Sequence, residues 1–337
     1  MKRKGTADGV SMDGELIKLD SWFGNPIISP DYEKSKDQVF MEATLAIIME
    51  GDDYTHLLAG GIGWEDRDQD LPSWVVDWSR PPKIYSNASF NTRLDTMGDR
   101  FWTGLGKGAK IKDGCFSPLD RKRIMGKCMP FDRIVFLDIR RILSDEYPWT
   151  DYGTFPAIST REALWRVLLD VGETRRPKRH SCESGVCEVP AYGFSPGFPE
   201  SNGEQHLCRD LVDRAFGAWA EFKGGELGRA FEKAIMRSQS FGCRIAINSK
   251  GFLGTVPPGS QLGDEIFVHV DCPTPFLVRK ARKTGVDPGV PCFYRHLVGK
   301  AHFLRLMKGE WARPYGEIGT EEFEANMKKT MKNVVLV

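Results

Sequence analysis

Five side chains that could bind a metal lie within one 29-residue stretch: His180, Cys182, Cys187, His206 and Cys208. Cysteine thiolates and histidine nitrogens are the ligands of tetrahedral zinc sites. The spacing, Cys-x4-Cys followed by His-x-Cys, is close to known zinc patterns without being diagnostic of one. The alternative is an untethered loop that happens to contain these residue types. We expect no metal here and keep zinc as the alternative.

A second candidate lies where an acid stands between two tryptophans, Trp74, Asp77 and Trp78, in residues 71–79. Pro72 disfavours a helix, and an extended chain would place positions 74, 76 and 78 on one face, with Asp77 on the other. Asp77 could be a pocket acid whose pKa is raised by burial. The reading we favour has Asp77 facing water or capping a turn while the indoles form core. Trp74, Asp77 and Trp78 are therefore the candidate binding residues.

Other motifs give weaker evidence for a binding or catalytic function. Residues 104–108, Gly-Leu-Gly-Lys-Gly, hint at a phosphate loop, but a preceding strand and a Gly-Lys-Ser/Thr ending are missing. The Cys and His residues are too scattered along the sequence to nominate a catalytic dyad. The catalytic residues stay unknown, and we expect no cofactor.

Composition narrows the class of partner. The 47 basic and 46 acidic residues give a net charge of +1, so charge provides no case for nucleic acid or an anionic membrane. The sequence has no run of 18 apolar residues and no apolar signal-peptide core behind its basic start. We expect a cytoplasmic chain with reduced cysteines, a protein partner, and no nucleic-acid or membrane partner.

The spacing of apolar residues along the chain predicts the helices and strands that position these side chains. Together these elements predict an α+β fold. Residues 1–30 are expected to be poorly ordered, and 31–240 to be mainly helical. The second region holds the Trp residues, a strand pair (124–128 and 131–139) and a flexible insertion at 172–205. A small antiparallel barrel-like part is expected over 241–310, and a tail with a helix over 311–337.

Local signals support these boundaries. Ser35 and Gln38 form a capping box ahead of a helical apolar pattern, and a second box, Ser159 with Glu162, precedes another. Helical periodicity returns over 207–219 and 227–235. From Phe241 the period becomes two, which predicts strands at 244–248, 252–255, 265–270, 276–279, 294–299 and 302–306.

Residues 71–78 resemble the Leu-Pro-Ser-Trp-Val-Pro-Asp-Trp element of fungal heterokaryon-incompatibility (HET) proteins, with Val76 in place of proline. Further similarities to the region that follows the HET domain are residues 251–254, 257–258, 263–266, 275–279 and 297–299. The similarity departs at 300–305, where the family has Glu-Ala-Tyr-Val-His-Gly. The family's N-terminal HET module has no counterpart here, so a natural short form and a truncated gene product both stay open.

The resemblance implies a setting of fungal nonself recognition and programmed cell death. We expect a non-catalytic recognition or regulatory protein derived from such a HET protein, which acts by binding another protein. The alternative is an enzyme that acts on a small molecule in a fungal biosynthetic pathway, recruited onto the same scaffold. Whether the chain is an enzyme therefore stays open, with the non-enzymatic reading favoured.

Overall fold

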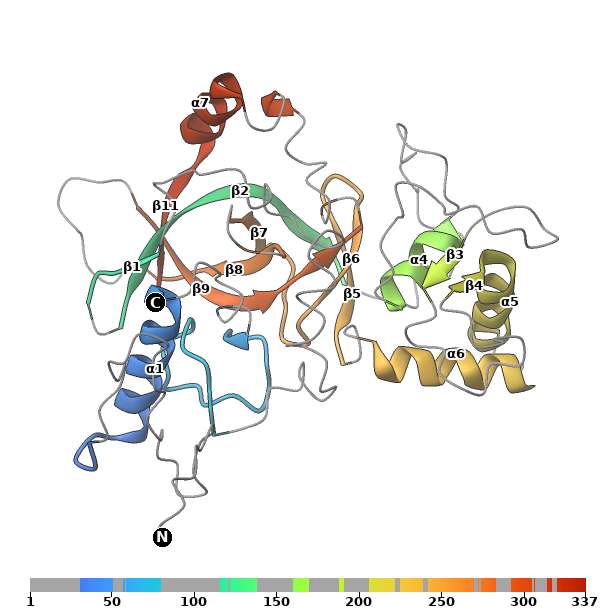
Figure 1. The fold of residues 1–337 in the computed structure, drawn as a ribbon, viewed down its shortest axis with the longest axis horizontal. Coiled ribbons are helices and arrows are strands. Elements are labelled where there is room, and N and C mark those ends of the chain that lie inside the picture. The colour runs from blue at the N-terminus through green and yellow to red at the C-terminus, as the bar shows by residue number, and fades with distance from the viewer. Residues whose placement is uncertain are drawn as a thin grey trace, which may run out of the picture.

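Figure 1 shows the computed structural model of the chain, which describes most of the helices and strands that the sequence predicts. It describes residues 31–50, 57, 59–79, 116–120, 122–137, 160–169, 188–190, 206–221, 225–238, 242–269, 272, 274–282, 292–304, 306, 314–316 and 320–337. The expected poorly ordered segment 1–30 lies outside these residues. No helix in the described part of the chain is long and apolar enough to cross a membrane.

The chain contains both helices and strands, as the α+β prediction requires. The helices are α1 (Lys36–Glu50), α4 (Thr160–Leu168), α5 (Arg209–Ala220), α6 (Gly225–Arg237) and α7 (Glu321–Thr330). The main strands are β1 (Ser117–Pro118), β2 (Ile124–Phe136), β5 (Arg244–Asn248), β6 (Leu253–Val256), β7 (Glu265–Val268), β8 (Phe276–Lys280), β9 (Cys292–Lys300), β10 (His302–Phe303) and β11 (Lys332–Leu336). Two further short strands are β3 (Glu188–Pro190) and β4 (His206–Cys208).

Five strands close into a barrel. β2 pairs antiparallel with β11, and β11 pairs parallel with β9. β9, β8 and β7 then follow as antiparallel neighbours, and β7 returns to β2 and closes the ring. β2 continues beyond the ring, where it pairs with β5, which leads on to β6 and β10. One long strand therefore belongs to both the barrel and a neighbouring sheet.

The expected strand pair at 124–128 and 131–139 is wrong, because one strand, β2, runs through both segments. Pro130 does not break this strand, since the pairing of β2 with β7 shifts register between Pro130 and Asp132. An irregularity of this kind tolerates a residue that has no amide donor. The barrel also takes β2 and β11 from outside the range 241–310, and β11 lies in the expected tail 311–337.

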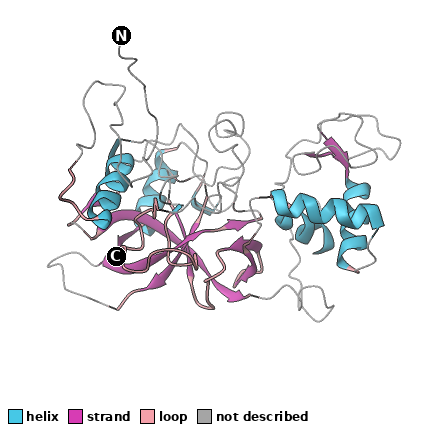
Figure 2. Ribbon diagram, turned by 90° about the horizontal axis from the view of Figure 1, so that it is seen from below, coloured by secondary structure: helices cyan, strands magenta, loops and turns pink. Residues whose placement is uncertain are grey.

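Three helices form a second packing unit beside the sheets (Figure 2). α4, α5 and α6 share one apolar cluster with Ile245, Ile247 and Leu253 of the β5–β6 hairpin. Trp165 of α4 and Phe231 of α6 are fully buried in this cluster. Of the insertion 172–205, the described residues are those of β3, which pairs antiparallel with β4.

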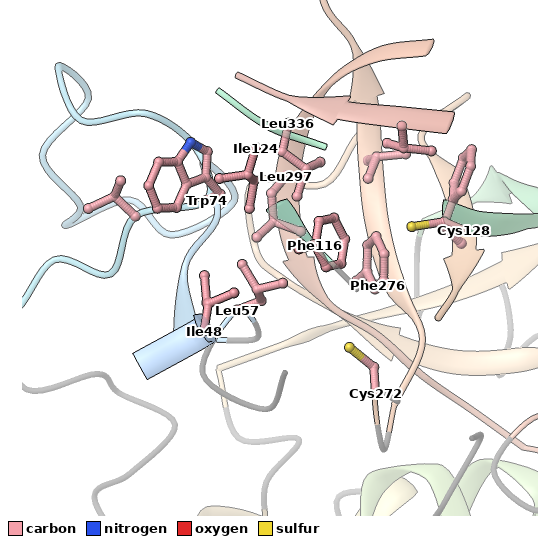
Figure 3. Close-up of a cluster of buried hydrophobic side chains, with 14 of the residues drawn as sticks. Ile48, Leu57, Trp74, Phe116, Ile124, Cys128, Cys272, Phe276, Leu297 and Leu336 are labelled. Carbon is pink, nitrogen blue, oxygen red and sulfur yellow. The ribbon is translucent and has the colours of Figure 1, made fainter. Parts of the chain in front are cut away.

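The capping box predicted at the start of α1 is confirmed. The Gln38 amide donates to Ser35 Oγ at 3.3 Å, and the Ser35 amide donates to Gln38 Oε1 at 3.0 Å. α1 packs Phe40 and Ile48 into an apolar cluster that also contains Trp74 and residues of the barrel. Ile124, Cys128, Phe276 and Leu297 of the barrel strands gather around Phe116 in this cluster, while Trp74 lies at its edge (Figure 3). The segment that carries the tryptophans therefore shares a core with the barrel.

Replacing Trp74 tests this shared core. Trp74 is 0 % exposed, so Trp74→Ala leaves a cavity and should lower the free energy of unfolding by about 3–5 kcal/mol. Tyr32, which is 78 % exposed, supplies the control, and Tyr32→Ala should change stability by less than about 0.5 kcal/mol. Urea titration of both variants provides the comparison. A loss below about 1 kcal/mol for Trp74→Ala would show that the indole does not belong to the core.

Candidate functional site

The segment around the two tryptophans, residues 71–79, forms turns rather than the expected extended strand. The Val75 amide donates to the Pro72 carbonyl at 2.9 Å, which folds the chain back at Trp74. Ser73, Trp74, Val75 and Val76 are all buried in succession, so the predicted alternation of faces is wrong. Trp74 is core, as predicted, whereas Trp78 is half-buried.

The shape of this segment depends on Arg67. Its guanidinium donates to the Asp68 carbonyl at 2.9 Å, to Leu71 at 3.1 Å and to Val75 at 3.3 Å, and it also contacts the Pro72 carbonyl. Burial lowers the pKa of Arg67, while the charges of Asp77 and Asp68 act to raise it. Because arginine stays protonated in proteins, a buried cation orients the carbonyls of the turn.

Ser73 connects the segment to the barrel. Its hydroxyl accepts a hydrogen bond from the Leu297 amide of β9 at 2.8 Å and donates to the Val337 carbonyl. Its amide donates to the same carbonyl at 3.0 Å, and its own carbonyl accepts from the Gly61 amide at 2.8 Å. Every polar group of Ser73 therefore has a partner, and these partners come from three separate parts of the chain.

A glycine loop lies between this segment and β9. The Ile62 and Gly63 amides donate to the Leu297 and Val298 carbonyls of β9, each at 2.8 Å. A Cβ atom on Gly61 would lie 2.3 Å from the Val298 carbonyl oxygen, and its φ of +113° is one that side chains rarely adopt. The close approach of these two backbones therefore requires glycine at position 61.

Asp77 caps turns instead of acting as a pocket acid. Its carboxylate accepts from the Asp68 amide at 3.0 Å and from the amide and hydroxyl of Ser79 at 3.1 and 2.5 Å. Partial burial acts to raise the pKa of Asp77, but these hydrogen bonds and the charge of Lys36 outweigh it, so the pKa lies below its ordinary value. A carboxyl with a lowered pKa is ionised at neutral pH and holds no proton to donate.

The same network extends to α1. Lys36 Nζ lies 2.6 Å from Asp68 Oδ2, and the Val76 amide donates to Thr44 Oγ1 at 3.2 Å. Trp74 Nε1 donates to the Lys122 carbonyl at 3.0 Å. The accessible rim of the segment therefore consists of Ser79 and the half-buried Asp77 and Trp78, held in place by these hydrogen bonds.

The other candidate residues are only partly described. His180, Cys182 and Cys187 lie outside the described residues, as do residues 104–108. His206 and Cys208 lie in β4, where the backbone alone is described. Among the described residues, no group of three or more His, Cys, Asp or Glu side chains could hold a metal ion. Burial raises the pKa of the Cys128 thiol, so this cysteine stays protonated and unreactive.

Residue 57 and residues 59–79, here called the joint, attach the segment with the tryptophans to the barrel and carry a small polar rim. Sequence reasoning missed Arg67 and Ser73, which hold this joint together. Arg67 is the single cation in the run Asp66-Arg67-Asp68-Gln69-Asp70, and Ser73 stands inside the segment already selected for its tryptophans. The sequence shows both residues, but it does not reveal that they bond to Val75, Leu297 and Val337.

Comparisons with known proteins give no match. No protein-family model, no curated protein and no solved structure matches this chain. The resemblance to HET proteins therefore depends on the quoted sequence motifs.

Replacing Arg67 tests its role in the joint. Lysine keeps the charge but cannot reproduce the planar set of donors, so Arg67→Lys should lower the free energy of unfolding by about 3 kcal/mol. Arg161, whose side chain is 43 % exposed and pairs with Asp213, provides the matched control. Arg161→Lys should cost less than about 1 kcal/mol. Equal losses for the two variants in urea unfolding would contradict the role given to Arg67.

Proposed function

We propose that this chain is a non-catalytic recognition or regulatory protein, related to the region that follows the HET domain in HET proteins. It acts by binding another protein, in the setting of fungal nonself recognition and cell death, and it does so in the cytoplasm. The residues that carry the resemblance are scattered over more than 200 positions of the sequence. Their convergence in one folded unit is the observation that supports the proposal.

Two contacts connect those residues, and a third contact, through Gly259, lies directly beside one of the similar segments. Ser73, in the segment with the tryptophans, accepts a hydrogen bond from the Leu297 amide in the similar segment 297–299. The Gly259 amide, directly after Pro257 and Pro258, donates to the Gly63 carbonyl at 2.8 Å. Asp264 forms a bidentate pair with Arg279, with distances of 2.8 and 2.9 Å. Motifs that resemble one family thus support one another physically, which favours a shared scaffold over unrelated local similarities.

The chemistry of the joint also fits a binding role. Trp74 is committed to the core, Ser73 to holding β9, and Asp77 to capping turns while ionised. These residues are occupied in fixing a surface, which is what a recognition scaffold needs, because a pre-organised surface loses less conformational entropy on binding.

Expression in a filamentous fungus tests this function. The full chain alone should leave viability equal to that of an empty vector, because a binding protein without its partner triggers nothing. Co-expression with a HET-domain protein of the same organism should change the frequency of cell death. The Trp74→Ala chain, which differs at one core position and loses core packing there, should lose that effect.

A second arm addresses catalysis directly. The purified chain, incubated with NAD, should release no nicotinamide above the rate without protein. Cell death on expression of the chain alone, or NAD turnover that a point substitution in this chain abolishes, would contradict a non-catalytic role. An unchanged death frequency in every co-expression would contradict the regulatory role.

A further inference from the structure

The surface beside the end of β2 presents an exposed leucine on a rigid turn. Leu262 is 66 % exposed, and it stands in the turn of residues 261–264 that leads into β7. The Asp264 amide donates to the Gln261 carbonyl at 3.2 Å, and Gly263 has a φ of +86°. This is a type II turn with glycine at its third position, and Leu262 occupies the second.

Buried charge fixes this turn. Asp264 is 3 % exposed, and one of its oxygens accepts from the Gln261 amide at 2.8 Å. Arg279 clamps the same carboxylate and also donates to the Gly259 carbonyl at 2.9 Å. Arg244 donates to the Ser260 carbonyl at 3.0 Å and to the Leu137 carbonyl at 3.1 Å, which joins the turn to the end of β2.

The neighbouring part of β2 adds to this surface. The Gly263 amide donates to the Ile134 carbonyl at 2.9 Å, and the Ile134 amide donates to the Asp264 carbonyl at 2.8 Å. Ile134 is buried, whereas Arg133 and Val135 on either side of it are exposed. Val135 is 40 % exposed, so a second large apolar side chain is accessible close to the turn.

The charge of this surface is positive on balance, because the cations Arg133 and Lys250 outnumber the carboxylate of Asp132. Asp264 is paired with Arg279, and Glu265, which stands opposite Arg133 in the β2–β7 pairing, binds Arg295 at 2.6 Å. Asp132 accepts from the Ser249 hydroxyl and from the Lys250 amide. Among the described residues, neither Arg133 nor Lys250 forms an ion pair with a carboxylate. Lys250 Nζ lies 3.9 Å from the centroid of the Phe131 ring, and Arg133 is exposed. Accessible apolar side chains therefore lie beside positive charge.

We propose that this surface, formed by Leu262, Val135, Arg133 and Lys250, is the docking site for an acidic protein partner. The partner supplies an apolar pocket that receives Leu262 and carboxylates that pair with Arg133 and Lys250. A pre-organised apolar anchor within a charged rim is the arrangement that concentrates binding energy at protein interfaces. Like-charged partners are rejected by the same cations. This inference rests on the proposed function and names the surface that performs it.

Photo-crosslinking from the full chain tests the site. p-Benzoylphenylalanine is placed at position 262 in one chain and at position 119 in another, both expressed in the organism that encodes the protein. Leu119 is 39 % exposed and lies beside β1, so it serves as the control position. Position 262 should crosslink to one discrete protein whose contact peptide contains apolar residues and Asp or Glu, and position 119 should not.

Charge reversal supplies a second readout on the same chain. Arg133→Glu should lower the crosslinking yield at position 262 by about tenfold, because it places like charges together. Lys127→Glu, which reverses an exposed cation elsewhere on β2, should leave the yield unchanged. The thermal unfolding midpoint of each variant, measured beforehand, identifies any loss of folding.

Several results would overturn this site. These are equal crosslinking from positions 119 and 262, no crosslink at 262, a contact peptide without acidic residues, adducts with lipid or nucleic acid, or a yield that Arg133→Glu does not change. If the co-expression effect on cell death persists in that case, the recognition function stands and another surface performs it. If that effect is also absent, the function itself is wrong.

Discussion

The attachment of the segment with the tryptophans to the barrel depends on the hydrogen bonds of Ser73. The hydroxyl group alone joins β9, through the Leu297 amide, to the Val337 carbonyl that follows β11. These two contacts span 224 and 264 positions of the sequence. β9 and β11 are parallel neighbours in the barrel. The buried Ser73 side chain bonds to β9 and to the residue that follows β11, and it thereby attaches the segment with the tryptophans to the barrel.

Two features allow Ser73 to reach that place. Arg67 shapes the turn from inside through its bonds to neighbouring carbonyls, and Gly61 lets the preceding loop approach the β9 backbone. Trp74 then fills the apolar cluster shared by α1 and the barrel. The polar contacts set the position and the indole supplies the buried area, so neither would hold the joint alone.

Local patterns predicted the elements that local interactions specify. The capping box at Ser35 and the alternation in β5, β8 and β9 gave the right element types. The path of β2 through Pro130 escaped prediction because partner strands decide whether a proline is tolerated. β11 escaped it because five residues become a strand only between β2 and β9. The turns at Trp74 depend on Arg67 and on distant backbone groups, which no local period reveals.

Native-state hydrogen exchange tests most directly whether this joint and the barrel form one cooperative unit. The amides of Gly61, Ser73 and Leu297 all donate within the joint. Their opening free energies should agree with those of the β11 amides to within about 1 kcal/mol, because breaking the joint opens the barrel. Exchange of the Gly61 and Ser73 amides through an opening several kcal/mol less costly, with β11 still protected, would contradict this account.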